Sequence, residues 1–148
     1  MIAYYFNIKI FGTELLIDEI LKILGNKIKI GNIIHPNDKN PKRDEKYGFG
    51  CISLLHPKVY IADDELVDYL SWLSDFIKEY FDIFYTLGME EVWFYTNIYY
   101  TDSFLSLELF GNDFLKQIAS YKISISIPMN IYEVTEQEII EMLRERPY

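Results

Sequence analysis

Apolar residues alternate with polar or small residues at the start of the chain, which is the period of a strand with one buried face. The alternation runs over residues 2–11, and Gly12 ends it. A helix is predicted next over residues 17–24, because apolar positions recur there at three- and four-residue spacing and acidic residues occupy its first turn. Gly25 follows as a residue that suits a helix C-terminus.

Residues 31–48 are rich in Gly, Pro, Asn and charged side chains, and we predict a long exposed basic loop there. A second strand is predicted over residues 49–55. The longest helix begins near Asp63 or Asp64, whose side chains can accept from the free backbone N–H groups of the first turn, and it ends at Leu87. Its apolar stripe widens until it nearly encircles the segment, so we expect this helix to be covered on most sides.

The remaining predicted elements are strands over residues 91–100 and 103–110, a helix over 112–120, a strand over 121–127 and a helix over about 135–146. The last helix opens with Thr135-Glu136-Gln137-Glu138. This pattern is a capping box, in which the first and fourth residues satisfy each other's backbone donors.

The predicted elements define an α+β fold in a single domain over residues 1–148. We expect a mostly antiparallel or mixed sheet of about five strands with helices packed on it. Within residues 49–127 the order matches the split β-α-β arrangement of ferredoxin-like domains. A three-layer or swapped topology stays open.

Composition and charge narrow the possible partners. The chain has 148 residues, of which 50% are hydrophobic and 25% charged, as expected for one globular domain. Its net charge is −9, with six Lys/Arg and three Asp/Glu in residues 27–46 but five and seventeen in residues 61–148. Such a field repels phosphate backbones and attracts basic proteins, so we expect no nucleic-acid partner. A surface that only keeps the protein in solution is the alternative.

The sequence offers little for metal or cofactor chemistry. Cys51 is the one cysteine, and His35 and His56 each precede a proline with no further ligand at metal-binding spacing. We therefore expect no cofactor, no metal and no enzymatic activity. No apolar run is long enough to span a membrane. The single cysteine and the missing secretory signal predict a cytoplasmic protein.

Three motifs stand out in the pattern: Leu15-x-x-Asp18-Glu19-Ile20-x-x-x-Leu24-Gly25, Leu70-x-Trp72-Leu73, and Leu105-x-Leu107 leading to Phe114-Leu115. Together they resemble a bacterial family of small domains of unknown function, family 4279, over roughly residues 3–134. The resemblance implies an α+β fold and no established activity. Small acidic bacterial proteins of this kind are suspected of acting as immunity factors against toxins, so the resemblance implies that role by analogy.

The predicted sheet has a second face, opposite the apolar positions such as Ile8 and Phe94 that point at the helices. Tyr, Trp, Ser and Asn crowd this face, and these residue types suit a recognition surface. The candidate partner-binding residues are Tyr5, Glu90, Glu91, Trp93, Tyr95, Tyr99 and Glu108. Alternatively, the C-terminal helix covers this face through Ile139, Ile140 and Leu143, or a homodimer covers it.

Three hypotheses of function follow. The first is a non-enzymatic protein-binding module, most concretely a bacterial immunity protein that neutralises a cognate, basic toxin through an acidic and aromatic surface. The second is a small-ligand-binding or oligomeric structural domain, with the ligand held between the sheet and the helices. A hydrolase or transferase with an unrecognised site is the third and weakest hypothesis.

Overall fold

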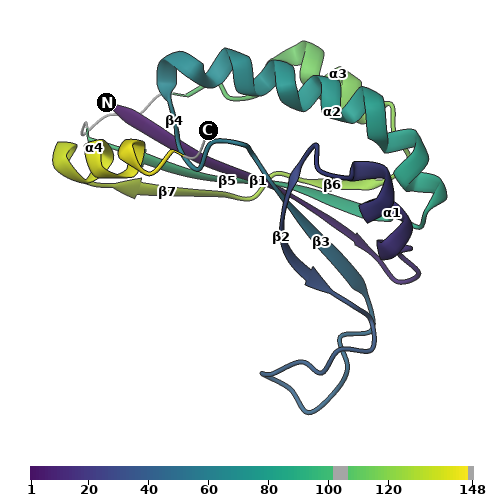
Figure 1. Cartoon of the computed structure of the whole chain (residues 1–148). Helices are drawn as coiled ribbons and strands as arrows, with labels where there is room; N and C mark the ends of the chain where they lie inside the picture. The colour runs from purple at the N-terminus through teal and green to yellow at the C-terminus, as the bar shows by residue number, and fades with distance from the viewer. Residues whose placement is uncertain (102–106, 147–148) are drawn as a thin grey trace.

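One mixed sheet of seven strands organises the fold in the computed structural model, which describes residues 1–101 and 107–146 (Figure 1). The strands are β1 (Ile2–Gly12), β2 (Lys29–Ile34), β3 (Gly50–Leu55), β4 (Ile61–Ala62), β5 (Glu91–Tyr100), β6 (Ser124–Ser126) and β7 (Met129–Glu133). The helices are α1 (Ile17–Leu24), the 3-10 turn η1 (Asp63–Glu65), α2 (Leu66–Thr86), α3 (Asn112–Ala119) and α4 (Glu136–Arg144). The predicted α+β class is confirmed, with more strands than the five expected.

Strand β1 lies in the middle of the sheet, whose order is β2-β3-β1-β5-β6, with β4 also paired to β1 and β7 to β5. It pairs antiparallel with β3, β4 and β5, whereas β5 pairs parallel with β6 and β7. Because β3 and β5 run in the same direction on either side of β1, the unit β3-α2-β5 is a split β-α-β unit. The strand between β3 and β5 is β1, the N-terminal strand. The strand predicted over residues 103–110 does not take that place.

The strand predicted over residues 103–110 is wrong for residues 107–110, which are irregular, and residues 102–106 lie outside the described part of the chain. Strand β5 has no edge to offer it, because β1 pairs with one side and β6 and β7 pair with the other. The chain instead returns through α3 to β6, which makes a parallel β-α-β unit in place of the two consecutive strands predicted over 91–100 and 103–110.

Three strands were not predicted: β2, β7 and the two-residue β4. Residues 31–34 belong to β2 and not to the loop predicted over 31–48. The strand predicted over residues 121–127 forms only as β6, and β7 follows Pro128. The Pro128 carbonyl accepts a hydrogen bond from Thr96 N at 3.0 Å, so the ladder along β5 continues past the proline.

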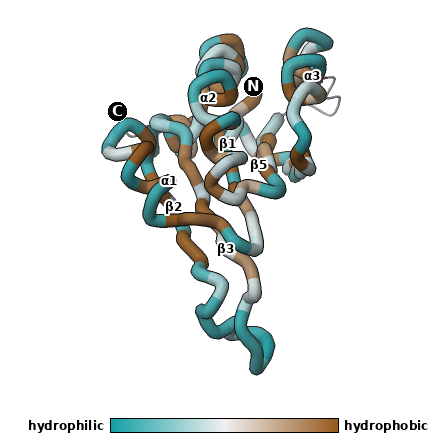
Figure 2. The backbone as a smooth tube through the Cα atoms, turned by 90° about the vertical axis from the view of Figure 1, so that its right-hand side faces the viewer, coloured by the Kyte–Doolittle hydropathy of each residue, from teal (hydrophilic) through white to brown (hydrophobic). Residues whose placement is uncertain are grey.

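Residues 35–49 form a hairpin arm that projects from the end of β2 and β3 and is hydrophilic along most of its length (Figures 1 and 2). A bridge pairs Lys39 with Lys46, and Tyr47 N donates to Asp38 O at 3.1 Å. The arm is exposed, as its polar composition predicts. Its two sides still pair through their backbones, so the arm extends the β2–β3 hairpin.

Helices α1, α2 and α3 cover one face of the sheet (Figure 1). The even-numbered residues of β1 and β5 point at them, and the Phe6 ring stacks on Tyr69 of α2 with 3.7 Å between centroids. The largest side chains that are almost completely buried are Tyr4, Tyr69, Phe81, Phe84, Phe94, Ile8, Ile10, Ile20, Leu24, Ile52, Leu54 and Leu73. This face is the core of the protein. Within the described ranges, no helix has the length and apolar character needed to cross a bilayer.

Helix α4 lies on the other side of the sheet from α1, α2 and α3 (Figure 1). Its predicted capping box forms, since Thr135 N donates to Glu138 Oε2 at 2.8 Å and Glu138 N donates to Thr135 Oγ1 at 3.3 Å. Ile139 is completely buried against the sheet, and Arg146 Nη1 lies 2.9 Å from Glu65 Oε1. The helix is thus held by one apolar anchor and one ion pair beyond its end.

A close backbone approach fixes the end of β1 against the turn before β5. A Cβ atom on Gly12 would lie only 2.0 Å from the carbonyl oxygen of Gly88. Gly88 itself has φ +92°, a conformation that L side chains rarely adopt. Only glycine at these two positions lets the two segments touch, and this contact places Glu90 and Glu91 beside Phe11.

We predict that Gly12→Ala destabilises the protein by roughly 2 to 3 kcal/mol, because its Cβ overpacks against rigid backbone. Gly111→Ala is the matched control, since a Cβ there meets nothing within 4 Å. As Gly111 is the N-cap of α3, the control should lose only about 0.5 kcal/mol. Urea unfolding of both variants measures the difference, and equal losses would contradict the role of the Gly12 contact.

Candidate functional site

The sheet has a second face on the side away from α1, α2 and α3. Ile8 of β1 and Phe94 of β5 are paired and buried under these helices, so their neighbours Lys9 and Trp93, also paired, point the opposite way. We define the second face by Tyr5, Asn7, Lys9, Phe11, Glu91, Trp93, Tyr95, Asn97, Tyr99, Asn130 and Tyr132. Apart from buried Asn7 and exposed Tyr132, these side chains are all half-buried.

Five of the seven residues predicted from the sequence lie together on this second face: Tyr5, Glu91, Trp93, Tyr95 and Tyr99. Glu90 lies at its rim, at the start of β5. Glu108 does not belong to it, and that part of the prediction is wrong. It lies in the irregular segment before α3 and lines a separate hollow with Ile98 and Ile131, which face the helix side.

Tyrosines gather at the end of the second face beside α4. The Tyr60 ring lies 5.9 Å from Tyr5 and 5.9 Å from Tyr99, and Tyr99 stacks on Tyr132 at 5.2 Å. Burial raises the pKa of the Tyr99 hydroxyl, with a further contribution from Tyr60. Helix α4 contacts β1 and β5 here. The alternative in which the C-terminal helix covers the face therefore applies to this end only.

Polar contacts order the middle of the second face. Lys9 Nζ lies 4.8 Å from the centroid of the Tyr95 ring, a cation–π contact. Asn130 Nδ2 donates to Tyr95 Oη at 2.6 Å and to Asn97 Oδ1 at 3.0 Å. Asn7 is 7% exposed, and its Oδ1 has no hydrogen-bond partner among the described residues. A buried acceptor of this kind is costly unless a donor reaches it.

A hollow of about 510 Å³ opens at the other end of the second face. We call it the Trp93 hollow; it is lined by Phe11, Gly12, Thr13, Phe49, Glu90, Glu91, Trp93 and Ser124. Trp93 Nε1 donates to Glu91 Oε1 at 2.6 Å, and Thr13 Oγ1 donates to Glu90 Oε1 at 2.6 Å. The hollow thus combines apolar walls with two anchored carboxylates.

The set of candidate partner-binding residues left out several residues of this surface. Phe11 and Lys9 share the period-two alternation of Tyr5, so the β1 pattern places them on the same face. Phe49 and Tyr132 could not be found in this way, because Phe49 enters through the base of the hairpin arm and Tyr132 through β7.

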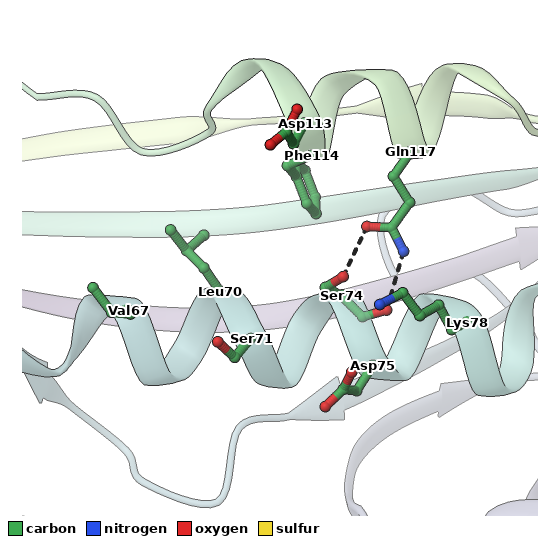
Figure 3. Close-up of a pocket in the computed structure, with 9 residues that line it drawn as sticks. All are labelled: Val67, Leu70, Ser71, Ser74, Asp75, Lys78, Asp113, Phe114 and Gln117. Carbon is green, nitrogen blue, oxygen red and sulfur yellow. Dashed lines mark hydrogen bonds between the residues drawn. The ribbon is translucent and has the colours of Figure 1, made fainter.

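A second hollow, of about 570 Å³, lies between α2 and α3 (Figure 3). Ser74 Oγ donates to Gln117 Oε1 at 3.0 Å, and Gln117 Nε2 donates to Ser74 O at 3.1 Å. Leu70 and Phe114 point into the space between the two helices (Figure 3). These bonds span the hollow and join the helices, which makes it a packing seam in the helix layer.

His56 follows β3 and packs against two aromatic side chains of α2. Its ring centroid is 5.4 Å from Tyr69 and 5.0 Å from Trp72, and its Nδ1 accepts from Lys58 N at 3.2 Å. Burial lowers the pKa of this imidazole. The neighbouring Glu65 is also partly buried, which would raise its pKa, but hydrogen bonds from Lys58 and from Ala62 N hold the pKa of that carboxyl below its usual range.

Metal and thiol chemistry have no visible basis in the described residues. No group of three or more His, Cys, Asp or Glu side chains there could hold a metal ion. Cys51 is buried in β3, and burial raises the pKa of its thiol to about 11, which keeps it protonated and unreactive at neutral pH.

Comparison of the chain with models of known families, with curated proteins and with solved structures gives no match. The assignment of function therefore depends on the geometry of the second face and on the charge of the chain.

We predict that Trp93→Ala lowers the free energy of unfolding by about 1 to 2 kcal/mol, whereas Phe94→Ala lowers it by about 3 to 5 kcal/mol. The two residues are adjacent in β5, but Phe94 is completely buried under α2 and α3 while Trp93 is half-buried on the second face. Chemical denaturation measures both losses. A Trp93→Ala loss as large as that of Phe94→Ala would show that the second face is part of the core.

We predict that protonation of His56 destabilises the fold on acidification. Its pKa is lower in the folded state than in the unfolded chain, so the unfolded chain binds more protons, and stability is lost as the pH falls below about 6.5. The melting temperature should therefore drop more between pH 7.5 and pH 5.5 for the wild type than for His56→Gln. His35→Gln is the matched control at an exposed histidine. Parallel falls in the wild type and His56→Gln would contradict this prediction.

Proposed function

We propose that this chain is a non-enzymatic protein-binding module whose docking site is the second face of the sheet. The observation that carries the proposal is the combination of residue types on that face. Large rigid aromatic side chains lie half-exposed beside small amides and a hollow, an arrangement that buries area on binding at low entropy cost. Helix α4 packs on β1 and β5, while Lys9, Trp93 and Tyr95 keep part of their side chains exposed.

The charge of the chain favours a basic partner. Residues 61–148 carry five Lys/Arg against seventeen Asp/Glu. The cations of the hairpin arm are partly neutralised within the arm, since Lys39 pairs with Asp44 at 2.7 Å and Arg43 with Glu45 at 3.5 Å. The arm therefore leaves most of the acidic field unbalanced, and that field steers a basic protein toward the chain.

The most concrete form of this proposal is a bacterial immunity protein that binds and neutralises a cognate basic toxin in the cytoplasm. A non-catalytic role is supported by how the carboxylates of the second face are used. Glu91 accepts from Trp93 and Glu90 accepts from Thr13, so both are held in place by neutral donors, and the residues that line the hollow include no histidine or cysteine.

A homodimer is the second candidate, because edge strand β7 exposes apolar side chains. Met129 and Ile131 are 51% and 53% exposed. A second copy paired along this edge would cover both. Light scattering after size exclusion distinguishes the two cases, since the chain alone has a mass of 17.6 kDa.

The test of the proposed function uses the protein encoded next to this chain in its genome. If that neighbour is a toxin, its expression alone should arrest growth, and co-expression of this chain should restore it. With the purified pair, Trp93→Ala should raise the Kd about thirtyfold, on the order of 2 kcal/mol, because aromatic residues dominate binding energies. Glu90→Lys should instead slow association and weaken its dependence on salt.

Tyr85→Ala provides the control for that experiment. Tyr85 is 54% exposed on α2, on the opposite side of the sheet, so its loss should leave the Kd unchanged. A neighbour that does not bind, or equal weakening by Tyr85→Ala and Trp93→Ala, would overturn the proposal that the second face is the docking site.

A further inference from the structure

We infer that the Trp93 hollow takes an arginine side chain of the partner. The inference rests on the proposed function, because it assigns a binding subsite within the same surface. It is carried by the walls of the hollow, by the two carboxylates at its rim and by the absence of any cationic side chain among its lining residues.

Three aromatic rings line the hollow at tilted angles. The centroid of the Phe11 ring lies 4.9 Å from that of Trp93, with 53° between the ring planes. It lies 6.1 Å from the centroid of Phe49, with 57° between the planes. The faces of aromatic rings carry partial negative charge and attract cations, and the Trp ring attracts them most strongly. A planar guanidinium can also stack on such a face, which an ammonium cannot do.

The two carboxylates have no cationic partner in the part of the chain that the structure describes. Each uses Oε1 to accept one bond from a neutral donor, Trp93 Nε1 or Thr13 Oγ1. Within residues 1–101 and 107–146, no ion pair involves Glu90 or Glu91, and no hydrogen bond reaches either Oε2. The hollow therefore presents acceptor oxygens beside aromatic faces.

The cation that the second face itself carries, Lys9, contacts another residue. Lys9 pairs with Trp93 in the β1–β5 register, but its ammonium lies over the Tyr95 ring, two residues further along β5. A cation from outside the chain would therefore meet the carboxylates without displacing an internal ion pair.

The backbone around the hollow is fixed before any partner binds. Glu90 N donates to Phe11 O at 2.9 Å, and Ser124 N donates to Glu90 O at 3.0 Å. The glycine contact between Gly12 and Gly88 holds the same turn. Because the site is held in this way, binding does not have to order it, and more of the interaction energy contributes to affinity.

Arginine fits this chemistry better than lysine. Its guanidinium presents several N–H donors in a rigid plane, so it can stack on Trp93 while its edge donates to carboxylate oxygens. Lysine offers a compact, strongly hydrated charge that can satisfy the carboxylates but gains less from the rings. The hollow volume of about 510 Å³ leaves room for the aliphatic stem of the side chain.

The experiment uses N-acetyl-L-arginine amide as the probe and the indole N–H resonance of Trp93 as the readout. We expect a saturable shift of this resonance with a Kd of about 1 mM, because a single side chain provides only a weak interaction. N-acetyl-L-citrulline amide has almost the same shape without the charge and should bind at least about tenfold more weakly. N-acetyl-L-lysine amide should fall between them.

Variants locate the site. Glu91→Gln keeps a carbonyl oxygen that can accept from Trp93 Nε1, so the fold is preserved, and it should weaken arginine binding about tenfold. Glu108→Gln is the matched control, because Glu108 is exposed and lies outside the hollow. No saturable shift, equal binding of citrulline, or equal loss in Glu108→Gln would overturn the inference.

Failure of this inference can be told apart from failure of the proposed function. If Trp93→Ala weakens the toxin complex but the arginine probe does not bind, the second face is the docking site without an arginine subsite. If the probe binds in the hollow but no partner docks on the second face, the proposed function fails and the cation site stands.

Discussion

The antiparallel ladder between β1 and β5 is the constraint on which the rest of the structure depends. It runs from the pair Ile2–Tyr100 to the pair Phe11–Glu91 without interruption. Because side chains alternate along a strand, this ladder decides at once which residues enter the core and which reach the second face. A slip of one residue in either strand would bring Lys9 or Trp93 under the helices. The stacking of Phe6 on Tyr69 holds the middle of β1 against α2, and the contact of Gly12 with Gly88 holds the end of β1.

The same constraint explains which parts of the fold the sequence could predict. Strands β1 and β5 and helices α1 and α2 have strong periodic patterns, because each has one face in the core, and all four were predicted within two or three residues. Strands β2 and β7 lie at the edges of the sheet, where exposed residues such as Ile33 and Met129 weaken the alternation. The strand predicted over 103–110 is wrong over residues 107–110 because strand pairing is a tertiary property, and both sides of β5 are occupied.

The candidate site was predictable to the same extent. Tyr5, Trp93, Tyr95 and Tyr99 follow from alternation within two strands that the sequence identified, so their common face could be predicted before the register was known. Glu108 was assigned to the same face only through a strand that does not form there. Phe49 completes the Trp93 hollow from the base of the hairpin arm, and no local pattern reports the distance between that base and β5.

Long-range and short-range forces would act at different stages of the proposed recognition. At physiological salt the Debye length is about 8 Å, so a partner feels the acidic field of residues 61–148 only as it comes near, and this field governs the rate of encounter. Once an arginine side chain fills the Trp93 hollow, that side chain and the aromatic walls would exclude water from half-buried Glu91, which would make the contact less sensitive to salt. The hollow would therefore govern the rate of dissociation. Raising the salt concentration should slow association of the complex much more than it speeds dissociation, and a parallel change in both rates would mean that the partner is held by the acidic rim alone.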